Sequence, residues 1–124
     1  MRVFYVDDDR INGLLFEEAC RMAGDVDVQV VVDGAEALDL ARRWVPDIFV
    51  VDLNLPDTNG FALVAALRGL PACESIPAFL CTADESDEVR ARAAELGFAG
   101  CWTKPIELRS MLAALAQFRH RAGA

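Results

Sequence analysis

Short apolar runs alternate along this chain with longer stretches in which apolar residues recur at helical spacing. The run from Ile48 to Val51 is continuous and mostly β-branched, which is typical of a strand buried on both faces of a parallel sheet. It ends at Asp52, so this carboxylate is expected at the carboxyl edge of the sheet. Five such runs predict strands, at residues 1–6, 27–32, 48–51, 78–81 and 98–103.

The stretches between these runs predict five helices, at residues 11–23, 35–44, 61–70, 86–96 and 106–119. The first is indicated by Ile11, Leu14, Leu15, Ala19 and Met22 at helical spacing, and by Gly24 as its stop. The fourth is rich in Arg and Glu, so we expect it to present a solvated face. In the last helix the residues expected to face inward are Leu108, Met111, Leu112, Leu115 and Phe118.

Five strand and helix units without a linker or repeat predict a three-layer α/β domain with a parallel sheet and right-handed crossovers. Of the two common doubly wound arrangements, we favour the flavodoxin-like (βα)5 sandwich with strand order 2-1-3-4-5. In that order the strands beginning near Val3 and Ile48 flank the switch point where ligands bind. We expect residues 1–124 to form a single domain.

The composition and charge of the chain argue against several classes of function. With 54% hydrophobic and 26% charged residues the chain is predicted to be globular, and its net charge of −8 argues against binding nucleic acid through phosphates. No apolar run approaches the roughly 20 residues of a membrane span, and no signal-peptide pattern opens the chain, so we expect a cytoplasmic protein without membrane insertion. Cys81 and Cys101 fall in predicted strands and could be neighbours, but free thiols are the expected state.

Chemically active side chains follow four of the predicted strands. Because the carboxyl ends of parallel strands meet at one edge, we expect them to converge. They are Asp7 and Asp8, Asp52, Thr82, and Lys104. Carboxylates in one crevice repel each other by roughly 4 kcal/mol for a pair about 4 Å apart at an effective dielectric near 20, so a cation is needed. Oxygen ligands without His or Cys suit a hard ion such as Mg²⁺.

The same set suits phosphoryl chemistry. Lys104 and the hydroxyl of Thr82 complement phosphoryl oxygens, and a carboxylate nucleophile beside Mg²⁺ can form an aspartyl phosphate. Taken singly, Asp52 or Thr82 could be a turn cap and Lys104 a surface lysine, while Asp9 fits a helix cap. Their joint placement at strand ends favours Asp52 as the phosphoryl acceptor.

Four motifs show a resemblance to a known family. They are VDDD at 6–9, the spacing of Asp52, Pro56 and Gly60, the pair Thr82-Ala83, and the pair Lys104-Pro105. With these motifs the chain resembles a response-regulator receiver domain of two-component signalling over essentially its full length. The resemblance implies that Asp52 accepts a phosphoryl group from a sensor histidine kinase or a histidine phosphotransfer protein, and that binding to an output protein or a separate effector domain changes in response.

The resemblance also implies roles for the neighbouring residues. Asp8, Asp52 and the backbone carbonyl of Asn54 would bind Mg²⁺ (or Mn²⁺), with Asp7 acting through a bound water. Lys104 would contact the phosphoryl oxygens and be joined to Pro105 by a cis peptide bond. The chain would be a switch and not a multiple-turnover enzyme.

The sequence departs from the family pattern at one of the residues that would change conformation on phosphorylation. Thr82 would swing toward the phosphoryl group, but the aromatic residue usual three positions before the lysine is replaced by Cys101. Trp102 cannot substitute for it, because adjacent side chains of a strand point to opposite faces. We hypothesise that Thr82 and the loop at 83–86 transmit the signal without an aromatic rotation.

Two other classes deserve comparison. A haloacid-dehalogenase-like phosphatase would use Asp7 as nucleophile and Asp9 as general acid, but Ile11 replaces the expected Thr or Val and no acidic pair follows Lys104. A flavin-binding module would need a phosphate-cradling loop after the first strand, where residues 7–9 are acidic instead.

Overall fold

The computed structural model describes residues 1–84 and 86–122, with side chains for residues 1–84 and 86–118. Strands and helices alternate throughout this part of the chain. The strands are β1 (Arg2–Val6), β2 (Asp27–Val31), β3 (Ile48–Asp52), β4 (Ala78–Thr82) and β5 (Gly100–Thr103). The helices are α1 (Arg10–Ala23), α2 (Gly34–Ala41), α3 (Gly60–Arg68), α4 (Asp87–Glu95) and α5 (Leu108–Ala122).

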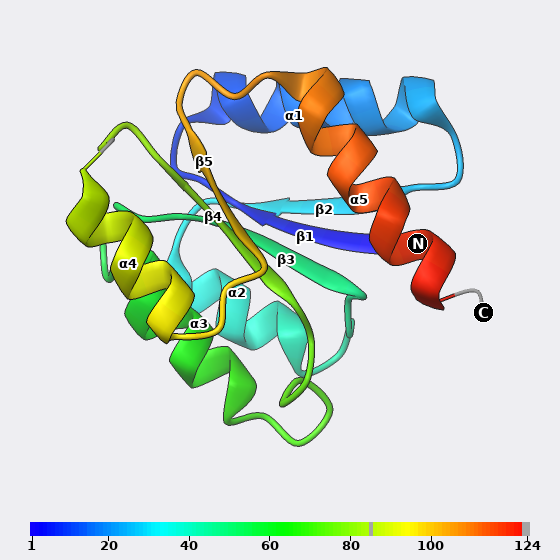
Figure 1. Ribbon diagram of the computed structural model, residues 1–124. Helices are drawn as coiled ribbons and strands as arrows, with labels where there is room; N and C mark the ends of the chain where they lie inside the picture. The colour runs from blue at the N-terminus through cyan, green and yellow to red at the C-terminus, as the bar shows by residue number, and fades with distance from the viewer. Residues whose placement is uncertain (85, 123–124) are drawn as a thin grey trace.

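The five strands form one parallel sheet in the order β2-β1-β3-β4-β5. Helices α1 and α5 cover one face, and α2, α3 and α4 cover the other (Figure 1). The predicted flavodoxin-like fold and its strand order are therefore confirmed. The order places β3 between β1 and β4, so the carboxyl end of β3 lies at the centre of the sheet edge.

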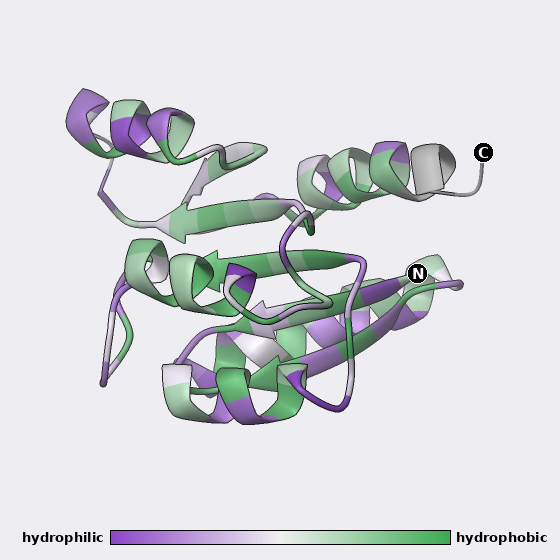
Figure 2. Cartoon of the chain, turned by 90° about the horizontal axis from the view of Figure 1, so that it is seen from below, coloured by the Kyte–Doolittle hydropathy of each residue, from purple (hydrophilic) through white to green (hydrophobic). Residues whose placement is uncertain are grey.

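The core consists of two apolar clusters, one on each face of the sheet. In β3, Phe49 and Val51 belong to the cluster under α2 and α3, whereas Ile48 and Val50 belong to the cluster under α1 and α5. All five residues of β3 are buried, as the continuous apolar run predicted. Figure 2 shows the hydrophobic colouring concentrated in the central strands and the inward sides of the helices.

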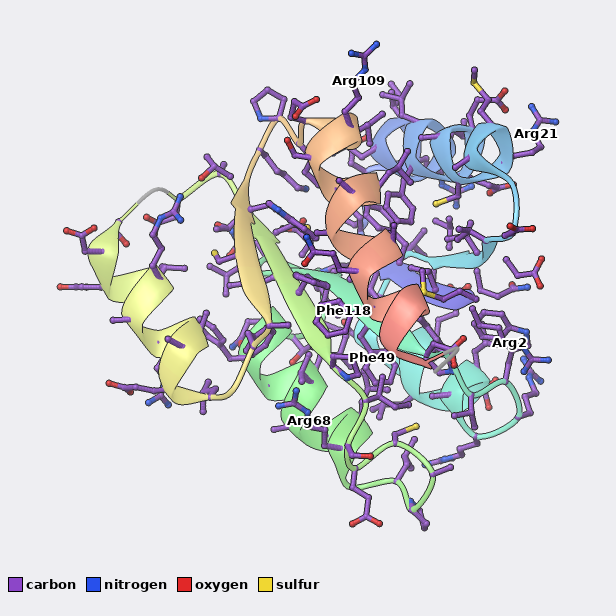
Figure 3. The ribbon with its side chains drawn as sticks, turned by 45° about the vertical axis from the view of Figure 1, so that its right-hand side comes forward. Arg2, Arg21, Phe49, Arg68, Arg109 and Phe118 are labelled. Carbon is purple, nitrogen blue, oxygen red and sulfur yellow. The ribbon has the colours of Figure 1, made fainter. Side chains whose placement is uncertain are left out.

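Aromatic contacts anchor both layers. Phe118 of α5 points toward the sheet and meets Phe79 of β4 edge to face at 5.4 Å, while Arg21 and Arg109 point away from the body (Figure 3). On the opposite face Trp44 meets the ring of Phe4 at 6.0 Å. The expected inward-facing residues of α5 all pack into the cluster on its side of the sheet: Leu108, Met111, Leu112, Leu115 and Phe118.

Several element ends differ from the predictions. Helix α2 ends at Ala41 and not at Trp44, because the amides of Arg43 and Trp44 both donate to the carbonyl of Leu40 in a tight turn. Strand β5 begins at Gly100, two residues later than predicted, and α5 begins at Leu108. Local turn bonds of this kind leave little trace in hydrophobic periodicity.

Helix α1 buries a different face from the one its apolar periodicity suggests. The side chains on its outer surface are Ile11 (69% exposed), Leu14 (66%), Leu15 (53%) and Met22 (80%). The buried residues are Gly13, Phe16 and Cys20. A Cβ atom on Gly13 would lie 2.7 Å from Cγ1 of Val30, so the missing side chain lets α1 approach β2 closely. The spacing predicted the helix correctly but not its orientation.

Helix α4 is the most polar helix, in agreement with its Arg- and Glu-rich sequence. Ala93 is its one buried residue, and Figure 2 shows most of this helix, at the upper left, in the hydrophilic colour. Within the described residues no helix is long and apolar enough to cross a membrane.

Candidate functional site

The carboxyl edge of the sheet brings two aspartates and a lysine into direct contact. Asp7 follows β1, Asp52 is the last residue of β3, and Lys104 follows β5. Nζ of Lys104 donates to Oδ2 of Asp7 at 2.9 Å and to Oδ2 of Asp52 at 3.0 Å. Three strands far apart in the sequence thus place their ends at one ion-pair centre, as expected for the carboxyl ends of parallel strands.

This ion-pair centre is largely shielded from water. Asp7 is 1% exposed and Asp52 is 7% exposed. Burial raises the pKa of Asp52, and the hydrogen bond and charge of Lys104 offset this shift only in part. Burial alone would lower the pKa of Lys104, but its hydrogen bonds to the two aspartates outweigh that effect and raise it. Lys104 is therefore held as a cation between two carboxylates.

A third carboxylate completes an oxygen-rich cluster. Asp7, Asp8 and Asp52 each offer a carboxylate oxygen within 4.8 Å of the others, and Asp8 is exposed. One lysine cannot neutralise three carboxylates at this spacing, so the cluster favours an additional cation. An all-oxygen set with one solvent-facing member fits Mg²⁺, which retains part of its water shell.

Asp7 is held by more donors than the sequence indicated. Its Oδ2 accepts from the hydroxyl of Tyr5 at 3.0 Å and from Nδ2 of Asn12 at 3.4 Å, in addition to Lys104. Its Oδ1 accepts from the backbone amide of Asp9 at 2.9 Å. Tyr5 and Asn12 were not predicted; the available signal was a hydroxyl in an apolar strand, two residues before Asp7 and so on the same face.

The loop after β3 is fixed beside Asp52. The backbone amide of Asn54 lies 3.5 Å from Oδ1 of Asp52, and Asn54 pairs with Asn59 in an isolated bridge. The amide of Gly60 donates to the carbonyl of Leu53 at 2.8 Å. A Cβ atom on Gly60 would lie 2.8 Å from the carbonyl oxygen of Asp52, which explains the glycine of the motif.

A further carboxylate ties this loop to α2. Oδ1 of Asp57 accepts from the amide of Gly34 at 2.8 Å, and Oδ2 accepts from the amide of Ala35 at 3.0 Å. These two hydrogen bonds lower the pKa of Asp57. Asp57 therefore caps a helix that lies 22 or more residues earlier in the chain, a role that local sequence signals do not reveal.

Thr82 lies next to the ion-pair centre at the end of β4. It is 1% exposed, and its Oγ1 accepts from the amide of Asp84 at 3.0 Å. The hydroxyl thus caps the turn that begins the loop at 83–86, of which Glu85 lies outside the described residues. The hypothesis that this loop carries the signal stays a prediction.

Cys101 shares a sheet face with Thr82, whereas its neighbour Trp102 does not. The register aligns Cys101 with Leu80 and Trp102 with Cys81. Trp102 stacks on Phe79 at 4.3 Å within the cluster under α1 and α5. Cys81 and Cys101 therefore point to opposite faces, and both are free thiols.

The structure also shows two local features that the sequence predicted, the peptide bond before Pro105 and the cap of α1. The peptide bond between Lys104 and Pro105 is cis. Asp9 caps α1, where its Oδ1 accepts from the amides of Ile11 and Asn12. A carboxylate so engaged is poorly suited to be the general acid that the phosphatase alternative requires.

Comparison with known proteins identifies the family. The family model described as the response regulator receiver domain matches residues 3–116. The chain belongs to this family. Receiver domains of response regulators are phosphoacceptor switches in two-component systems, and the phosphatase alternative is not favoured.

Relatives support the same assignment. The chain is 32% identical over 118 residues to an uncharacterized 14.6 kDa protein of Leptolyngbya boryana, covering 95% of this chain and 89% of that protein. It is 34% identical over 122 residues to the transcriptional regulatory protein PrrA of Mycobacterium tuberculosis, covering 98% of this chain and 51% of PrrA. The receiver thus spans about half the length of PrrA.

Solved structures agree in fold. The chemotaxis response regulator CheY4 of Vibrio cholerae aligns with a TM-score of 0.85 at 27% identity, covering 94% of this chain and 97% of CheY4. The non-phosphorylated HemR receiver domain of Leptospira biflexa aligns with a TM-score of 0.81 at 32% identity, covering 94% and 92%.

Proposed function

We propose that residues 1–124 act as one phosphoacceptor domain of a phosphorelay, in which Asp52 takes a phosphoryl group from a phosphohistidine. The donor would be a sensor histidine kinase or a histidine phosphotransfer protein. The observation that carries this proposal is the hydrogen-bonded ion pair between Asp52 and Lys104 within a cluster of three carboxylates. In the transfer, a carboxylate oxygen of Asp52 forms a bond to phosphorus while the bond from phosphorus to the histidine nitrogen breaks.

The same carboxylates would supply the ligands of a divalent metal ion. Asp8, Asp52 and the backbone carbonyl of Asn54 would hold Mg²⁺ or Mn²⁺, with Asp7 supporting the ion less directly. When bound, the ion would neutralise charge on the phosphoryl oxygens. The spacing of the carboxylates supports this assignment, because their oxygens lie within 4.8 Å of one another.

Lys104 and Thr82 would respond to the new charge. Lys104 already contacts Asp52. A phosphoryl group on that carboxylate would give the ammonium group of Lys104 oxygens that carry more negative charge. The hydroxyl of Thr82 would give up its hydrogen bond with the amide of Asp84 and donate to the phosphoryl group instead. With Cys101 at the usual aromatic position, we propose that the turn after Thr82 carries the change toward α4.

The outer surface of α1 supports a role in partner binding. Ile11, Leu14, Leu15 and Met22 are between 53% and 80% exposed and lie one to four turns beyond the acidic cluster. Apolar side chains gathered in this way mark protein contacts more often than isolated ones do. We propose that the phosphohistidine-bearing partner contacts this helix, in the cytoplasm, and that an output protein or effector domain reads the phosphorylated state.

The decisive experiment is phosphorylation by a small donor. Incubation with acetyl phosphate and Mg²⁺ should add one phosphoryl group to the intact protein, as measured by mass spectrometry. The Asp52→Asn variant should not gain this mass, whereas Asp39→Asn, a change in an exposed ion pair on α2, should behave like the unmodified protein.

The phosphatase alternative predicts a different result. Steady turnover of p-nitrophenyl phosphate that is lost in Asp7→Asn, together with a mass gain that persists in Asp52→Asn, would contradict the proposal.

A further inference from the structure

The buried hydroxyl of Tyr5 has no role in the phosphoryl transfer proposed above. Tyr5 is 2% exposed, and it is the one tyrosine of the chain. Its ring stacks on Phe16 of α1 with the centroids 4.3 Å apart and the planes 14° apart. Its hydroxyl lies 3.0 Å from Oδ2 of Asp7. The tyrosine hydroxyl donates this hydrogen bond to the carboxylate.

We propose that Tyr5, assisted by Asn12, is a positioning residue that fixes the carboxylate of Asp7 for metal binding. The inference rests on the proposed function, because it concerns the ion that the acidic cluster would hold. It adds residues that touch neither the phosphoryl group nor the ion and act through Asp7 alone.

The hydrogen bonds of Asp7 support this role. Its Oδ2 accepts from Tyr5, Asn12 and Lys104, while its Oδ1 accepts from the amide of Asp9. Donors on both oxygens define the plane of the carboxylate as well as its position. The groups that hold a metal-site carboxylate in this way contribute strongly to metal affinity, although they do not contact the ion.

Tyr5 becomes more important when the site is occupied. A phosphoryl group on Asp52 would draw Lys104 away from Asp7, and Oδ2 of Asp7 would lose its charged donor. Asp7 is 1% exposed, so water has little access to replace that donor. Tyr5 and Asn12 remain as donors, which lets Lys104 move without leaving a buried oxygen unpaired.

Rigid packing makes Tyr5 the stronger of the two donors. Its hydrogen bond is 3.0 Å long, against 3.4 Å for that of Asn12, which is only half-buried. Burial is the main cause that raises the pKa of Tyr5, and the charge of Asp7 raises it further. The stacked ring fixes the hydroxyl in place, so that it points its hydrogen-bond donor at Oδ2 of Asp7.

The test measures Mg²⁺ affinity in variants that remove one donor each. Tyr5→Phe deletes the hydroxyl and keeps the ring that stacks on Phe16. The dissociation constant for Mg²⁺ alone, followed by NMR through the backbone amides of Asp9 and Asn54, should increase about tenfold. Asn12→Ala should give a smaller increase. A Tyr5→Phe affinity equal to that of the unmodified protein would overturn the inference.

Two controls separate positioning from packing. Thermal unfolding without Mg²⁺ shows whether Tyr5→Phe folds normally, and Phe16→Leu disturbs the ring stack while keeping the hydroxyl. We expect Phe16→Leu to lower stability and to leave Mg²⁺ affinity within about twofold. If instead Phe16→Leu weakens Mg²⁺ binding as much as Tyr5→Phe does, Tyr5 acts by packing and the inference fails.

A spectroscopic measurement uses the unmodified chain. Because tyrosine occurs once, selective labelling of its ring carbon Cζ gives a single NMR signal that reports the hydrogen bond of Tyr5. This signal should shift on Mg²⁺ addition with the same midpoint as the Asn54 amide. If the Asn54 amide titrates and the Tyr5 signal does not move, the inference fails while metal binding stands. If neither responds and acetyl phosphate adds no mass, the proposed function itself fails.

Discussion

Nζ of Lys104 and Oδ2 of Asp52 lie 3.0 Å apart, in an ion pair whose lysine side chain is 19% exposed and whose aspartate side chain is 9% exposed. The same ammonium pairs with Asp7 at 2.9 Å. Lys104 is thus the cation that makes two buried carboxylates compatible with the folded state. An ion bound at the neighbouring carboxylates would share this task.

Removing Lys104 should therefore destabilise the protein in a way that Mg²⁺ repairs. Lys104→Ala leaves two buried carboxylates without their cation, so the free energy of unfolding without Mg²⁺ should fall by about 3 kcal/mol. Saturating Mg²⁺ should recover much of this loss, because an ion that binds the folded state stabilises it. Urea unfolding with and without Mg²⁺ measures both quantities.

Arg43→Ala provides the control for this prediction. Arg43 pairs with Asp39 on the surface at 3.4 Å, and its loss should cost about 0.5 kcal/mol or less, with no dependence on Mg²⁺. A similar small loss for Lys104→Ala would show that the buried pairs contribute little.

Neutralising Asp52 should stabilise the protein at neutral pH. The raised pKa of Asp52 means that its folded-state carboxyl retains a proton more readily than the unfolded one. The stabilisation that Asp52 contributes is therefore fully present below pH 3.8, the ordinary pKa of an aspartate. It is lost as the pH rises through the folded-state pKa. Without Mg²⁺, Asp52→Asn should be more stable at pH 7 by about 1 kcal/mol, because the change removes part of the repulsion between the carboxylates.

The pH dependence distinguishes this explanation from a general packing effect. The difference between Asp52→Asn and the unmodified protein should vanish below pH 3.8, where both side chains are neutral. Urea unfolding at several pH values measures it. A variant that is less stable at pH 7 would mean that the pair with Lys104 outweighs burial and repulsion.

The glycine that closes the loop after β3 should not tolerate a side chain. In Gly60→Ala the new Cβ atom would lie 2.8 Å from both the carbonyl oxygen of Asp52 and Cδ1 of Leu80. Overpacking of this kind should lower the free energy of unfolding by about 2 kcal/mol. It should also slow phosphorylation by acetyl phosphate, because the backbone of Asp52, the proposed phosphoryl acceptor, must shift.

Gly69→Ala is the matched change. Gly69 ends α3 with φ of −74°, which other residues adopt freely, and its Cβ atom would meet the carbonyl oxygen of Ala66 at 3.2 Å. Its effect should be below about 1 kcal/mol. Equal losses in the two variants would show that closeness to Asp52 is not the cause.

The link between Asp57 and α2 should be visible in hydrogen exchange. Asp57→Ala removes both acceptors for the amides of Gly34 and Ala35, so these amides should exchange faster, and Asp57→Asn should have an intermediate effect. The lowered pKa gives Asp57 a stabilising contribution that is present above pH 3.8 and lost as the pH falls through its folded-state value. Unchanged exchange at Gly34 would refute the link.

The strand-end residues of the site could be predicted because the sheet leaves them little freedom. A parallel strand delivers its last side chain to one edge, so runs ending at Asp52 and Thr82 were enough to bring these residues together. The contacts of Tyr5 and Asp57 could not be predicted in the same way. The stack of Tyr5 on Phe16 depends on how α1 packs, and the hydrogen bonds of Asp57 depend on the path of the loop after β3. Neither follows from apolar spacing.

The orientation of helix α1 could not be predicted from its apolar spacing either. Leu14 and Met22 repeat at helical spacing, and yet they face outward. The side that packs inward is defined by Gly13, which admits Val30, and by Phe16, which stacks on Tyr5. Apolar residues on both sides of a helix leave its orientation open, and close approach to the sheet decides it.

The two faces of the sheet each carry one tryptophan, and this gives every layer its own optical probe. Trp44 contacts Phe4 on the side of α2, whereas Trp102 stacks on Phe79 on the side of α5, two residues before Lys104. In Trp44→Phe the remaining emission comes from the strand that leads into the ion-pair centre. In Trp102→Phe it comes from the opposite layer. Rearrangements that would follow the proposed phosphorylation can therefore be timed separately in the two halves of the molecule.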